Sequence, residues 1–117
     1  MEDFKILRSK LESILKLLPA STKRYIVLVP HAAQVHLEYL HRTIEIRAKF
    51  SDPDRIVEEE YSFARHIQEG FPNIRVLNPL ALFKQAEANG VKVYYVNDGH
   101  LNNTGQRILA DFIAQHL

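Results

Sequence analysis

The amino-acid sequence predicts an α/β protein in which helices flank a short, mostly parallel β-sheet. Three short apolar runs, at residues 25–29, 74–77 and 91–96, alternate with longer segments of helical periodicity. Strands that alternate with helices are typical of parallel strands joined by crossover helices. The chain has 117 residues, which allows one small domain, so we expect residues 1–117 to form a single domain.

Apolar residues at intervals of three and four positions predict five helices. Their expected ranges are 2–18, 33–49, 51–70, 79–88 and 102 onward. Pro19 stops the first helix, whose leucine-rich stripe we expect to pack into the core rather than against a partner helix. Ser51-Asp52-Pro53 gives the third helix a polar cap and a proline in its first turn, and Gly70 fits its C-terminal cap.

The composition excludes several classes of function. The 15 basic and 14 acidic side chains give a net charge of +1, so charge offers no argument for nucleic acid or an anionic membrane as a partner. The chain has no cysteine, which excludes disulfides, thiolate catalysis and cysteine-based metal sites. No apolar run has the length of a signal-peptide core or a spanning helix, so a cytoplasmic chain is the default expectation. That expectation holds only if Met1 is the natural start of the protein.

The most informative segment begins at the last predicted strand, where Asp98 and His100 stand just before a helix. A carboxylate that accepts a hydrogen bond from one imidazole nitrogen leaves the other nitrogen free to take a proton. Open α/β sheets place their sites at such strand ends. Asn102 or Asn103 is suited to cap the helix, and Gly105 permits close packing of its first turn. The alternative interpretation is a polar loop that only caps the helix.

This segment also carries a resemblance to a known family. The sequence Asp98-Gly-His-Leu-Asn-x-x-Gly105 resembles the last block of the SGNH (GDSL-type) hydrolases. The Asp-x-His spacing is similar to that of the branch related to polysaccharide O-acetylation proteins. The resemblance implies that His100 is the general base and that Asp98 orients it. It also implies a substrate class of O-acyl groups on small esters or carbohydrates, with no cofactor.

The resemblance extends over about residues 20–117. Residues 24–30 resemble the family's fourth strand, and residues 74–83 resemble its fifth strand, with Asn78 where that turn usually has aspartate. The resemblance therefore implies a three-layer, flavodoxin-like α/β fold. Residues 1–117 would correspond to the C-terminal half of an SGNH hydrolase.

The family's nucleophile block is missing from the sequence. No Gly-Asp-Ser motif occurs, and the oxyanion-hole glycine and the Gly-x-Asn-Asp block are also absent. The chain is therefore expected to be inactive alone. The family topology leaves one edge of the strand at 25–29 unpaired, so we expect pairing with a missing N-terminal half or as a homodimer. The alternatives are a non-catalytic binding module and a dimerisation module derived from the same fold.

Three histidines follow the first strand at five-residue spacing, namely His31, His36 and His41. On a helix this spacing turns each side chain about 140° from the last, so the three do not share a face and no metal site is expected. His31 comes directly after the strand and close to the expected site edge. We therefore name His31 and Asn102 as candidate binding residues beside the catalytic candidates Asp98 and His100.

Overall fold

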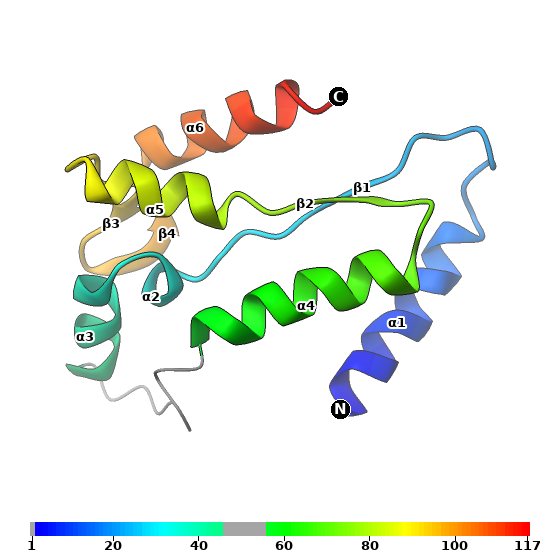
Figure 1. Ribbon diagram of the computed structural model, residues 1–117, viewed down its shortest axis with the longest axis horizontal. Helices are drawn as coiled ribbons and strands as arrows, with labels where there is room; N and C mark the ends of the chain where they lie inside the picture. Colours follow the sequence, from blue (N-terminus) through cyan, green and yellow to red (C-terminus); the bar gives the residue numbers. More distant parts are fainter. Residues whose placement is uncertain (1, 46–55) are drawn as a thin grey trace.

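The computed structural model describes residues 2–45 and 56–117, and it confirms the α/β fold class (Figure 1). Helices and short strands alternate along the chain. The elements in order are α1 (Glu2–Leu15), β1 (Tyr25–Val27), α2 (Ala32–Val35), α3 (Leu37–Glu45), α4 (Ile56–Gly70), β2 (Arg75–Leu77), α5 (Leu80–Ala88), β3 (Tyr94–Tyr95), β4 (Asp98–Leu101) and α6 (Asn103–Ala114). None of the described helices is long and apolar enough to cross a membrane.

Strands β1 and β2 pair in parallel, as a mostly parallel sheet requires, with Ile26 opposite Val76. Two backbone hydrogen bonds extend the ladder beyond the strands, from Leu28 N–H to the Leu77 carbonyl (2.9 Å) and from Arg75 N–H to the Arg24 carbonyl (3.0 Å). Figure 1 shows α6 on one side of this pair and α4 on the other, with α5 beyond the carboxyl end of β2. The helices therefore cover a small sheet in layers, as expected.

The third predicted strand does not join the parallel pair. Only Tyr94 and Tyr95 of residues 91–96 are in a strand, and this strand pairs antiparallel with β4 in a hairpin. The prediction was wrong because groups of α5 already accept hydrogen bonds from backbone N–H groups of residues 91–93, which a longer strand would use for pairing. The N–H of Val91 donates to the Ala86 carbonyl (2.9 Å), and the N–H of Val93 donates to the carboxylate of Glu87 (2.8 Å).

The predicted helix over 33–49 is also divided. Helix α2 ends before His36, whose backbone is extended with φ −150° and ψ 140°. Nδ1 of His36 accepts a hydrogen bond from the N–H of Glu38 (3.2 Å). In a continuous helix, a backbone carbonyl of the preceding turn would accept from this N–H. Because the ring of His36 accepts from it instead, His36 caps a new helix, and α3 begins after it. The rest of the predicted range and the expected cap at 51–53 lie outside the described residues.

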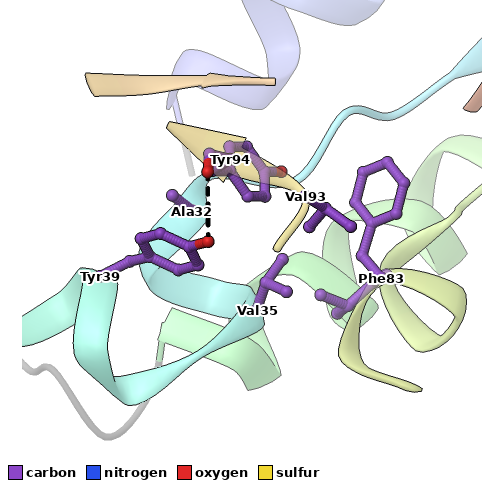
Figure 2. Close-up of a cluster of buried hydrophobic side chains, with 7 residues drawn as sticks. Ala32, Val35, Tyr39, Phe83, Val93 and Tyr94 are labelled. Carbon is purple, nitrogen blue, oxygen red and sulfur yellow. Dashed lines mark hydrogen bonds between the residues drawn. The ribbon is translucent and has the colours of Figure 1, made fainter. Parts of the chain in front are cut away.

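Two hydrophobic clusters form the core of the part of the chain that the structure describes. The first joins α2, α3, α5 and β3 around Tyr94 and Phe83, which are fully buried (Figure 2). The second packs one face of α1 against α4 and β2 around Ile67, which confirms the predicted core role for Phe4, Leu7, Leu11 and Leu15. Three other apolar residues of the predicted stripe are exposed, namely Ile6, Ile14 and Leu18. Neighbouring strand positions point to opposite faces, and accordingly Tyr94 is 1% exposed and Tyr95 is 48% exposed. The first cluster supports the hairpin that carries the candidate site.

Candidate active site

The structure brings Asp98 and His100 together on β4. They are two positions apart on a strand, so their side chains point to the same face. Oδ1 of Asp98 contacts Nδ1 of His100 closely and also accepts a hydrogen bond from the His100 backbone N–H (3.1 Å). The contact between Asp98 and the ring leaves Nε2 of His100 as the nitrogen available to another group. This is the geometry that an oriented general base requires.

The pair is open to solvent. The side chain of His100 is 86% exposed and that of Asp98 is 55% exposed. The hydrogen bond from the His100 ring, followed by the one from its backbone N–H, lowers the pKa of Asp98 below the ordinary carboxyl value. A carboxylate that stays ionised keeps its partner's Nδ1–H as a donor, which fixes the imidazole tautomer.

Removal of the imidazole is expected to raise the pKa of Asp98 toward its ordinary value. The folded-state pKa is depressed, so the interaction contributes stability above the unfolded carboxyl pKa and loses it as the pH falls through the folded value. A ¹³C NMR titration of the Asp98 carboxyl carbon in His100→Ala measures this change. His116→Ala, which removes a ring bonded to the Phe112 carbonyl, is the control. An unchanged Asp98 titration in His100→Ala would contradict the assignment.

Asn102 fixes the hairpin to helix α6. Its Oδ1 accepts from the N–H of Gly105 (2.8 Å), so the structure selects Asn102 rather than Asn103 as the helix cap. Its Nδ2 donates to the carbonyls of Lys92 (2.8 Å) and Tyr94 (3.3 Å). Both amide atoms thus have partners within the fold. A ligand-binding role for Asn102 stays a prediction, and a ligand would have to share these atoms.

Gly105 permits the close packing that the sequence predicted. A Cβ atom at this position would lie 2.1 Å from the carbonyl oxygen of Val93 and 3.1 Å from the Leu101 side chain. The first turn of α6 therefore rests directly on the backbone that leads into β3. This contact fixes the start of α6, which directly follows the strand that carries Asp98 and His100.

A buried carboxylate holds the hairpin from the other side. Glu87 on α5 is 5% exposed, and its Oε1 accepts from the hydroxyl of Tyr39 (2.6 Å) and from the N–H of Val93 (2.8 Å). The ammonium of Lys92 lies 3.4 Å from Oε2 of Glu87 and 2.7 Å from Glu38. Burial, then the bond to Glu87, raises the pKa of Tyr39, so its hydroxyl remains a donor. Sequence reasoning missed this network because Tyr39 and Glu87 are far apart in the chain.

His31 lies beside the site hairpin, as the sequence suggested. Its Nε2 is 3.8 Å from the position that a Cβ atom would take on Gly99, the residue between Asp98 and His100. The hydroxyl of Tyr94 donates to the carbonyl of Pro30, directly before His31. The described residues contain no group of three or more histidine, cysteine or acidic side chains placed to hold a metal ion.

A family model described as "SGNH domain (fused to AT3 domains)" matches residues 3–115. The chain therefore belongs to this SGNH domain family, and the fusion to AT3 domains agrees with the O-acetylation branch that the Asp-x-His spacing suggested. Comparisons with curated proteins and with solved structures gave no match.

Proposed function

We propose that this chain supplies the acid–base part of an SGNH-type ester hydrolase or O-acyltransferase. The observation that carries the proposal is the contact of Asp98 with Nδ1 of His100, which leaves Nε2 exposed on the strand. His100 acts as the general base and Asp98 holds its ring. The serine nucleophile comes from a segment outside the 117 residues.

In the proposed reaction, His100 takes up one proton and later returns it. The serine hydroxyl gives its proton to Nε2 of His100 while its oxygen attacks the acyl carbon of the ester. The imidazolium, stabilised by the carboxylate of Asp98, returns the proton to the departing alcohol. Water then releases the acid by the same route, or a carbohydrate hydroxyl accepts the acyl group.

Several observations support completion of the site by another segment. The acid–base pair is largely exposed, although most general bases work in sites that exclude water. The parallel sheet of the described residues has only two strands, and Val29, just beyond β1, is 54% exposed. The radius of gyration is 15.7 Å, larger than the roughly 13 Å of a compact domain of this length. An additional strand on β1 would cover this surface.

A nucleophile-bearing segment fits this edge better than a second copy of the chain. A homodimer would add another Asp98–His100 pair but no Gly-Asp-Ser serine, because the sequence contains none. The alternative function is a non-catalytic binding module that retains the hairpin. The absence of the nucleophile block favours this alternative if the native protein proves to consist of these residues alone.

The test uses the native species, purified through a tag on its C-terminus. We expect a fluorophosphonate probe to label a serine in a Gly-Asp-Ser peptide, either in a polypeptide heavier than 13.6 kDa or in a tightly bound partner. We expect His100→Ala to abolish labelling and His66→Ala to preserve it, because His66 bonds only within α4 and packs on Phe4. A native species of 13.6 kDa with no labelled serine and no esterase activity would refute the proposal.

A further inference from the structure

The side chain of Tyr95 lies on the same face of the hairpin as the acid–base pair. Tyr95 of β3 is paired with Asp98 of β4, and Val96 and Asn97 form the turn between them. Residues directly opposite each other in an antiparallel pair project from the same face, with Cβ atoms about 4.5–5.5 Å apart. Asp98 and His100 also share a face, as their side-chain contact shows. The ring of Tyr95 therefore stands beside Asp98, on the side of the strand that carries both members of the pair.

The burial of the two tyrosines agrees with this arrangement. Tyr94, the preceding residue, points to the opposite face and is buried in the first core cluster (Figure 2). Tyr95 is half exposed, belongs to neither core cluster, and makes no hydrogen bond through its hydroxyl with any other described residue. Arg42 donates to Asn97 in the turn (2.7 Å), which fixes the backbone next to Tyr95. The hairpin thus presents an aromatic ring, without a specific partner in the described chain, next to the proposed general base.

We propose that Tyr95 binds the sugar ring of an O-acylated carbohydrate whose ester lies at His100. The inference rests on the proposed function, and it chooses carbohydrates from the two substrate classes that the sequence suggested. The face of a tyrosine ring is flat and apolar, and its hydroxyl donates and accepts hydrogen bonds. A pyranose matches both properties because it has a face of C–H groups and a rim of hydroxyls. A small ester has no ring to cover the aromatic surface.

The spacing of Tyr95, Asp98 and His100 suits such a substrate. His100 is two strand positions beyond Asp98, at most about 7 Å along β4. Asp98 contacts Nδ1 of His100, so a ligand that reaches Nε2 from Tyr95 must extend past the carboxylate. A monosaccharide with one acyl substituent is long enough to do so, whereas the acetyl ester of a simple alcohol is not. The charge of Asp98 favours a neutral, hydroxylated ligand over an anionic one.

Two substitutions of Tyr95 separate the role of the ring from the stability of the strand. Tyr95→Val removes the aromatic surface but keeps a residue that favours strands, and Tyr95→Phe keeps the ring and removes only the hydroxyl. Val96→Ala is the matched control, because Val96 is also exposed and lies in the turn directly after Tyr95 but offers no ring. The amide shift of Val93, whose N–H bonds to Glu87, reports whether each variant retains the hairpin.

The experiment titrates the ¹⁵N-labelled 117-residue chain with a monoacetylated methyl glucoside and follows the Asp98 and His100 amides by NMR. We expect saturable shifts in the wild type and a dissociation constant about three- to tenfold higher in Tyr95→Val. Tyr95→Phe and Val96→Ala should bind the sugar nearly as the wild type does. Ethyl acetate, an ester without a sugar ring, should bind the wild type and Tyr95→Val equally weakly.

The outcomes separate this proposal from the proposed function. Absence of a saturable shift in the wild-type chain, or equal sugar binding by the wild type and Tyr95→Val, overturns the role of Tyr95. If Tyr95→Val spares sugar binding but weakens association with a serine-bearing polypeptide, the ring belongs to a protein interface instead. If Tyr95→Val weakens sugar binding and the fluorophosphonate probe finds no serine, the carbohydrate site stands without catalysis. If both experiments succeed, Tyr95 is a sugar-binding residue of the completed esterase.

Discussion

In the serine-containing species that the proposed function requires, His100→Ala is expected to lower kcat/KM for an acetyl ester by about 10²- to 10⁴-fold. The variant removes the only group placed to accept the serine proton beside Asp98 in the part of the chain that the structure describes. His100 is largely exposed, so the loss of its side chain costs little packing. The change should therefore appear in the rate and leave the unfolding free energy nearly unchanged.

Asp98→Asn separates orientation from proton transfer. The amide keeps the size of the carboxylate but lets its NH₂ group donate to Nδ1 of His100, which places the ring proton on Nε2. That tautomer cannot accept the serine proton. We expect a large loss in kcat/KM for Asp98→Asn as well, whereas His36→Asn should retain activity. Steady-state kinetics across pH provides the measurement, and full activity in either site variant would exclude the pair from catalysis.

The contact between Asp98 and His100 was predictable from the sequence because its geometry is local. Asp98 and His100 are two positions apart, and a strand places such residues on one face. The capping asparagine and Gly105 follow within the same block, so their roles could also be read from their order. Local spacing, with the strand–loop–helix context, was sufficient for the part of the site that lies between residues 98 and 105.

The surroundings of the pair depended on contacts that spacing does not encode. Residues 91–96 have strand composition, yet the carboxylate of Glu87 takes the N–H of Val93 that a longer strand would use. Glutamate is rarely buried, so nothing in the sequence marked Glu87 as an interior acceptor for Tyr39. Likewise, histidine caps helices less often than asparagine or serine, and the caps at His31 and His36 were missed. Gln34, three residues after His31, was the only available signal.

These contacts have a common consequence for the site. The hairpin is fixed by Asn102 to α6, by Glu87 to α5 and by Tyr94 to the segment before α2. Arg42 of α3 also donates to Asn97 in the hairpin turn (2.7 Å). Each anchor comes from within the described chain. The strand that carries Asp98 and His100 is therefore held in place by the described chain itself. Under the proposed function, another segment would have to supply the serine and the oxyanion donors.

The closest of these contacts predicts the largest loss of stability. In Gly105→Ala the new methyl group would lie 2.1 Å from the carbonyl oxygen of Val93. The methyl group belongs to the backbone of α6 and would meet the backbone of Val93, so no side-chain movement can relieve the contact. Either α6 or the residues that lead into β3 must move. Overpacking of this kind costs about 1–3 kcal/mol. We expect a loss in that range in the unfolding free energy, measured by urea denaturation followed by circular dichroism.

Gly70→Ala is the matched control, because a Cβ atom at the end of α4 meets no atom within 4 Å. Alanine restricts the unfolded chain more than glycine does, so this variant should be neutral or slightly stabilising. Equal stability of the two variants would mean that α6 does not rest on Val93 as described. If the packing is as described, Gly105→Ala should also shift the Asp98 and His100 resonances, because the start of α6 directly follows the strand that carries the pair.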